Sequence, residues 1–411
     1  MNQMLKTTRN MVFIFFIVLV LGCLLLTLSY MIPSENAFNQ INHNADDIQD
    51  ISPCFIPTYD TTKYDMYTDK IILSQISYYN HNVSLIENAM GAYRTDPGNF
   101  SQYLDGDESS IHDHPQYWHG NMVVYKPIFY FLDYNGFKIL DLFLELALII
   151  FVLKLMIDRN LKNFCIPLIL SLFLIHVEVI GTSLQYSPML YITLISIIIL
   201  LKYKEYLFKD NRLFYYFLVI GMATSYFDLL TYPLVSFAIP MIFYLLIEED
   251  KNNLKDNFVK IVLFAVVWAI GYIGMWGCKW IIGSIILKED VISIGLNKIF
   301  FRMNPNSYGE FSRFDAIMKN VLIYKKRGYF VIFALTAVYY VKRIIPSRKN
   351  INKVNLKHSI PLLIMASSPF IWYFVCCNHS YIHYWFTYRE LWIFFFAILC
   401  VAEYLKKSEN Y

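Results

Sequence analysis

Side chains that could carry chemistry are concentrated in one polar segment, residues 33–136, near the start of the chain. Asp65 and Asp69 lie four residues apart there, so a helix would place both carboxylates on one face. Paired carboxylates can act as a general base or bind a divalent cation such as Mg²⁺ or Mn²⁺, so the cofactor stays open. The helical spacing of Ile71, Ile72 and Ile76 favours a helix docked near a membrane over ordinary solvated loop charges.

Three histidines follow in the same segment, His112, His114 and His119, with Asp113 between the first two. Converging imidazoles and carboxylates can bind zinc or manganese, but this spacing matches no recognised metal motif. We therefore predict no metal site here. The run Tyr117-Trp118-His119-Gly120 is more typical of a hydrogen-bonded cap on the helix that follows, and His119 remains a candidate for substrate binding.

A second polar cluster, Asn378–Arg389, lies near the end of the chain. One helical turn would align His379 with His383, and Arg389 suits bidentate binding of a phosphate. An aromatic belt with a snorkelling arginine would explain the tyrosines and tryptophan of this loop. It would not explain two histidines and an arginine together, so we favour a binding site.

Asp228 lies in a third polar stretch, Thr224–Pro233, between two apolar runs. A carboxylate at a membrane edge is costly unless it faces a cavity or a partner, which favours a functional role. The alternative is that Asp228 only caps a helix. Glu178, beside His176, poses the same choice.

The composition indicates the elements that must position these residues. Hydrophobic residues make up 57% of the 411 residues and charged residues only 16%, against about 25% in soluble domains. After residues 11–32, apolar runs occur near 137–157, 164–182, 187–203, 213–230, 232–247, 258–285, 328–341, 358–377 and 388–405. We therefore predict an all-α protein of the cell membrane with about ten transmembrane helices.

The distribution of charge predicts the orientation. The segments expected inside hold 20 of the 35 lysines and arginines, so both ends are predicted inside. The expected domains are an N-terminal transmembrane helix (1–32), an extracytoplasmic loop with an interfacial helix at 123–134 (33–136), and a bundle of about nine helices (137–411). An outer loop, 286–327, carries Arg302 and other basic residues, which would suit either lipid headgroups or an anionic ligand.

Four stretches carry a resemblance to a known family: Thr68-Asp69, Tyr117–Gly120, Tyr226–Pro233 and Asn378–Arg389. In these features the chain resembles integral-membrane glycosyltransferases of the GT-C class. The resemblance implies a large outer loop after the first span, an acidic catalytic residue in that loop, and a polyprenyl-phosphate-linked sugar as donor. The chain departs from the class because no acidic pair follows the first span directly, the nearest being Asp46-Asp47.

The predicted function is transfer of a sugar from polyprenyl phosphate to a cell-envelope glycan or lipid on the outer face. Asp69, or secondarily Asp65, would be the catalytic base, while Arg389, His379, His383, His119 and Asp228 would bind the donor phosphate or substrate. No nucleic acid partner is expected. A lipid-linked glycan flippase or transporter is the alternative, although its charges are usually placed at mid-membrane. An envelope polysaccharide polymerase also remains open.

Overall fold

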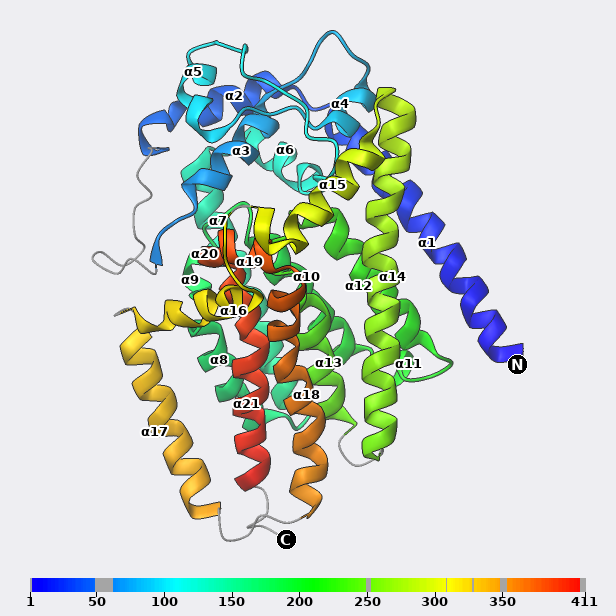
Figure 1. Ribbon diagram of the computed structural model, residues 1–411, viewed down its shortest axis with the longest axis vertical. Coiled ribbons are helices and arrows are strands. Elements are labelled where there is room, and N and C mark those ends of the chain that lie inside the picture. The colour runs from blue at the N-terminus through cyan, green and yellow to red at the C-terminus, as the bar shows by residue number, and fades with distance from the viewer. Residues whose placement is uncertain are drawn as a thin grey trace.

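The computed structural model of the chain describes residues 2–48, 62–248, 253–307, 309–326, 329–347 and 353–406. Regular structure in these ranges is helical, apart from isolated bridge positions such as the antiparallel bridge between Arg94 and His112. The predicted all-α class is therefore confirmed. Figure 1 shows a bundle of long helices with a layer of shorter helices across one end.

The first helix is α1 (Asn2–Ser29), which matches the first predicted span. Side chains such as Phe13, Phe16 and Ile17 are exposed along it. Only 17% of its most apolar stretch is buried inside the protein. A helix with so much exposed apolar surface is suited to contact with lipid.

The layer at one end is built from the polar segment after α1, and we call its helices α2–α6 the cap layer (Figure 1). Their bounds are α2 (Ser34–His43), α3 (Met66–Ser77), α4 (Leu85–Gly91), α5 (Phe100–Leu104) and α6 (Met122–Phe131). The predicted interfacial helix 123–134 thus ends three residues early. The reason is Asp133, whose Oδ1 accepts a hydrogen bond from the Gly136 N–H at 2.7 Å and so begins the next helix.

The bundle contains the remaining helices. They are α7 (Tyr134–Asp158), α8 (Cys165–Phe173), α9 (Val177–Ile180), α10 (Ser187–Lys202), α11 (Lys204–Leu207), α12 (Arg212–Phe227), α13 (Val235–Ile247), α14 (Leu254–Leu287), α15 (Val291–Met303), α16 (Arg313–Leu322), α17 (Phe330–Ser347), α18 (Lys353–Val375), α19 (Cys377–Ile382), α20 (Tyr384–Thr387) and α21 (Leu391–Lys406). Short 3₁₀ turns join several of them.

Four helical segments of the described chain are long and apolar enough to cross a membrane: Gln3–Ser29, Leu254–Leu287, His358–Val375 and Tyr384–Leu405. The other predicted spans are helical, but shorter or more highly charged. The run 164–182 is not one helix, because α8 ends at Phe173 and His176 adopts a left-handed backbone, with φ of 55°. The short α9 then begins at Val177.

Two glycines allow α12 and α14 to pack closely. A Cβ atom on Gly221 would lie 2.1 Å from the Trp268 carbonyl oxygen, and one on Gly271 would lie 2.3 Å from the Leu218 carbonyl oxygen. Small residues permit such close approach of helix backbones in membranes. Since α14 also contacts α4, this pair connects the bundle to the cap layer.

Candidate functional site

Asp69 is enclosed where the cap layer meets the bundle. Its side chain has no exposed surface, and it accepts hydrogen bonds from the Tyr134 hydroxyl at 2.6 Å, the Leu184 N–H at 3.1 Å and the Ser183 hydroxyl at 3.3 Å. Burial raises the pKa of the Asp69 carboxyl well above its usual range, although the Tyr134 hydroxyl opposes this shift. These contacts hold α3 against α7 and the loop before α10.

Asp65 lies one turn earlier and begins α3. Its Oδ1 accepts a hydrogen bond from the Thr68 N–H at 3.2 Å, the usual role of an N-cap residue. Its Oδ2 accepts hydrogen bonds from the Tyr186 hydroxyl at 2.7 Å and the Thr68 hydroxyl at 2.8 Å. The expected helix is therefore present, and the contact with Tyr186 joins Asp65 to the bundle.

Tyr186 also contacts Arg389. The Arg389 guanidinium lies 4.2 Å from the centre of the Tyr186 ring and 4.9 Å from that of Tyr388. Arg389 is only 2% exposed and donates to the Trp385 carbonyl oxygen at 3.2 Å, while its Nε has no partner. Its charge is stabilised by aromatic faces, with no carboxylate within 4 Å in the described chain.

His379 and His383 belong to the same cluster. Their rings lie 4.9 Å apart, and both contact Phe386, at 5.9 and 5.1 Å. Phe386 in turn lies 5.9 Å from Tyr186. The structure therefore brings Asp65, Arg389 and both histidines into one neighbourhood, with Tyr186 and Phe386 as the connecting rings.

Arg302, on α15, extends this cluster toward the cap layer. Its guanidinium hydrogen-bonds to Nδ1 of His379 and donates to the Tyr117 hydroxyl at 3.2 Å. The other ring nitrogen of His379 lies 2.6 Å from the Leu230 carbonyl oxygen. One histidine thus connects α15 to the turn after α12.

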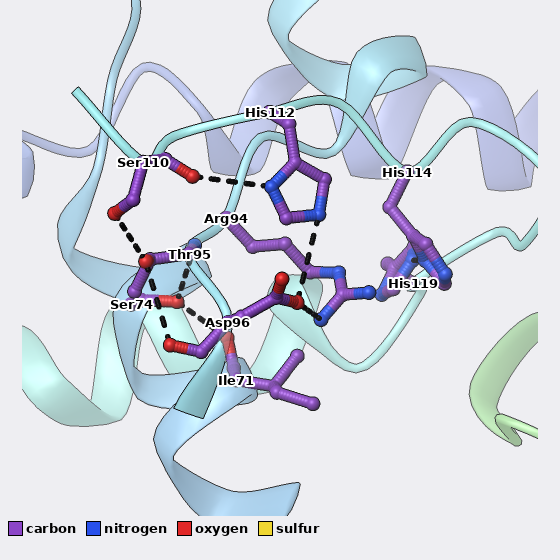
Figure 2. Close-up of polar contacts among 9 residues, drawn as sticks. All are labelled: Ile71, Ser74, Arg94, Thr95, Asp96, Ser110, His112, His114 and His119. Atoms are coloured by element: carbon purple, nitrogen blue, oxygen red, sulfur yellow. Dashed lines mark hydrogen bonds and ion pairs between the residues drawn. The ribbon is translucent and has the colours of Figure 1, made fainter. Parts of the chain in front are cut away.

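The histidines of the cap layer do not converge on one point. His114 and His119 are paired through Nδ1 and Nε2 at 3.1 Å, whereas Nε2 of His112 lies 3.8 Å from Asp96 (Figure 2). Figure 2 also shows the Arg94 side chain extending toward His119. No group of three or more metal-ligating side chains occurs in the described ranges.

Burial lowers the pKa of the imidazoles of His119, His379 and His383. Burial, together with Arg94 and Lys279, lowers the pKa of His119 to about 3. Burial and Arg302 lower the pKa of His383 to about 3, and they hold the pKa of His379 well below its usual range. Arg302, rather than a histidine, therefore supplies positive charge at this end of the cluster.

The motif Tyr117–Gly120 leads into α6 through a backbone hydrogen bond from the Met122 N–H to the His119 carbonyl oxygen at 3.0 Å, whereas the N-cap position is Asn121, without a side-chain cap hydrogen bond. It also docks the cap layer on the bundle. The Trp118 indole donates to the Met275 carbonyl oxygen at 2.7 Å, and the Gly120 N–H donates to the Tyr226 carbonyl oxygen at 2.8 Å. A Cβ on Gly120 would lie 2.2 Å from the Tyr226 ring, so only glycine fits here.

Asp228 stabilises the turn that His379 contacts. It accepts hydrogen bonds from the Thr231 N–H at 3.0 Å and from the Thr231 hydroxyl. Leu230 in the same turn has a left-handed backbone, with φ of 67°. Asp228 therefore maintains the geometry that presents the Leu230 carbonyl oxygen to His379.

A cleft of about 400 Å³ lies beside this turn, and we call it the aromatic groove. Its walls come from α14, α15, α18 and the Tyr117 loop, and include Trp268, Tyr272, Trp276, Trp280, Leu230 and Trp372. Two basic residues of α15, Lys298 and Arg302, also line it. The groove thus combines a long apolar surface with positive charge at one side.

Arg389, the arginine predicted to bind phosphate, does not line this groove; Arg302 does. Gly295, Lys298 and Arg302 share one face of α15 at helical spacing, and this spacing is the feature of the sequence from which the groove could have been predicted.

Comparisons of the chain with protein-family models, curated proteins and solved structures find no match.

Proposed function

We propose that the protein is a membrane glycosyltransferase that takes its sugar from a polyprenyl-phosphate donor and transfers it to a cell-envelope glycan or lipid. The observation that carries the proposal is that Arg302 lies on the wall of the aromatic groove. This arginine hydrogen-bonds to His379, which belongs to the same cluster as Asp65. A long isoprenoid chain needs an apolar surface, and its phosphate needs a cation close to that surface.

The donor would lie with its isoprenoid chain along the Trp268, Tyr272 and Trp276 side of the groove and its phosphate at Arg302 and Lys298. Neutral His379, held by Arg302 and the Leu230 carbonyl oxygen, would position the guanidinium. Arg389 would instead orient Tyr186, whose ring it covers.

The base would be Asp65 in preference to Asp69. Both carboxylates accept three hydrogen bonds, but those of Asp69 come from α7 and the loop before α10 and leave it no exposed surface, which supports a positioning role. Asp65 retains 7% exposure and contacts Tyr186, next to Arg389 and Phe386.

In the reaction, Asp65 would accept the proton of an acceptor hydroxyl as its oxygen attacks the anomeric carbon. The bond between that carbon and the phosphate oxygen would break, and polyprenyl phosphate would leave with the electron pair. Arg302 and Lys298 would stabilise the charge that develops on the leaving phosphate.

The test uses purified full-length protein in nanodiscs containing synthetic polyprenyl-phosphate hexoses and a lipid extract of the cell envelope. Mass spectrometry of the lipids should detect free polyprenyl phosphate and a glycosylated acceptor. A flippase would instead move the intact donor between leaflets, so scrambling in liposomes with no release of polyprenyl phosphate from any donor would overturn the proposal.

A further inference from the structure

A second cleft, of about 330 Å³, lies on the outside of the bundle between α6, α7 and α10. Its walls are mostly apolar, from residues that include Val124, Leu144 and Ile195. These three side chains are 42–45% exposed, so the cleft opens at the surface of the protein. It is distinct from the aromatic groove, with which it shares no lining residue.

Two polar oxygens at this cleft are buried without a hydrogen-bond donor. They are Oδ1 of Asn121 and Oδ2 of Asp141, and both residues are less than 5% exposed. The other carboxylate oxygen of Asp141 accepts a hydrogen bond from the Tyr191 hydroxyl at 2.7 Å. Because unsatisfied buried acceptors are costly, the two free oxygens indicate a ligand that brings hydrogen-bond donors.

A second buried carboxyl group lies near the site. Glu145 lies one turn beyond Asp141 on α7, is 1% exposed, and has no hydrogen-bond partner for either carboxylate oxygen. No ion pair joins Asp141 or Glu145 to a basic side chain in the described chain. A cationic donor is therefore the complementary group, since burying an unpaired carboxylate is far more costly than pairing it.

We propose that this cleft binds an amphiphile with a protonated amine headgroup, such as an amine-bearing membrane lipid. The ammonium would donate to Asp141 Oδ2 and Asn121 Oδ1. The alkyl chain would lie along Val124, Leu144 and Ile195 toward the surface. This site does not depend on glycosyl transfer.

The experiment uses two photoreactive probes with the same twelve-carbon chain and a terminal diazirine, one with a primary amine and one with a hydroxyl headgroup. Each is crosslinked at pH 7.5 to the full-length protein in nanodiscs, and labelled peptides are identified by mass spectrometry. We expect half-maximal labelling of α7 and α10 at about tenfold lower concentration of the amine, the usual gain from a charged hydrogen bond.

Asp141→Asn keeps the shape of the side chain and should abolish the preference while leaving labelling by the alcohol unchanged, which also shows that the variant is folded. The matched control is Asp158→Asn, on the exposed end of the same helix, which should retain the preference. Leu144→Trp should fill the cleft and reduce labelling by both probes. Equal labelling by the two probes in the wild type, or a preference that survives Asp141→Asn, would overturn the proposal.

Discussion

The Arg302 guanidinium hydrogen-bonds to the imidazole of His379, 77 residues further along the chain. This contact joins α15 to α19 at the edge of the aromatic groove. It gives a neutral histidine a fixed orientation and leaves the arginine as the cation of the groove. The proposed donor site depends on this pair, and several measurements test the structure around it.

The glycine contact between α12 and α14 should be essential for stability. We expect Gly271→Ala to lower the free energy of unfolding by about 1–3 kcal/mol, because its methyl group would collide with the backbone at Leu218. Gly277→Ala is the matched control on the same helix, since a Cβ there meets nothing within 4 Å. Thermal unfolding in detergent measures both, and equal midpoints would contradict the close packing.

Acid should destabilise the protein through His119. Its pKa is about 3 in the folded state and about 6.5 in an unfolded chain, so between these values the unfolded state binds a proton that the folded state does not. His119 should therefore contribute a fall in stability of up to about 1.4 kcal/mol per pH unit as the pH is lowered from 6.5 toward 3. Unfolding midpoints measured at several pH values should show this fall.

His119→Asn should make that slope shallower, and asparagine tolerates the left-handed backbone found there, with φ of 52°. His81→Asn, at an exposed position, is the control and should leave the slope unchanged. An identical pH dependence in wild type and His119→Asn would show that another group is responsible.

Substitutions of Asp65 and Asp69, the two candidates for the catalytic base, should have different effects on turnover. Asp65→Asn should reduce turnover about 10²–10⁴-fold, the usual contribution of positioned proton transfer, with little change in donor binding. Asp69→Asn should act mainly on stability, because it weakens the contacts among α3, Tyr134 and Leu184. Initial rates and unfolding midpoints of both variants distinguish the catalytic base from the residue that only stabilises the fold. If Asp69→Asn abolishes turnover in a protein of unchanged stability and Asp65→Asn does not, Asp69 is the base.

The membrane orientation can be tested by labelling single cysteines in intact cells. Asn82 is exposed in the cap layer and Asp210 is exposed in the loop between α11 and α12. With the predicted orientation, a membrane-impermeant maleimide should label Asn82→Cys and not Asp210→Cys. The opposite labelling pattern would invert the orientation.

Local patterns predicted much of the helical structure but little of the site. Apolar runs predicted the long helices of the bundle because burial against neighbours or lipid needs only a suitable composition. The break within 164–182 was missed because it depends on the backbone of a single residue, His176. The contact of Asp65 with Tyr186, whose ring Arg389 covers, was not predicted, since it joins residues 121 positions apart.

The central claim is that Arg302 in the aromatic groove binds the phosphate of a lipid-linked sugar. The most direct test compares release of free polyprenyl phosphate by wild type, Arg302→Gln and Arg313→Gln at increasing donor concentration in nanodiscs. Arg313 is the control because its guanidinium donates to the Phe374 carbonyl oxygen, and it does not line the groove. We predict that Arg302→Gln lowers kcat/KM at least tenfold, the loss of one charged phosphate contact, while Arg313→Gln matches wild type. Equal kcat/KM for wild type and Arg302→Gln would contradict the account.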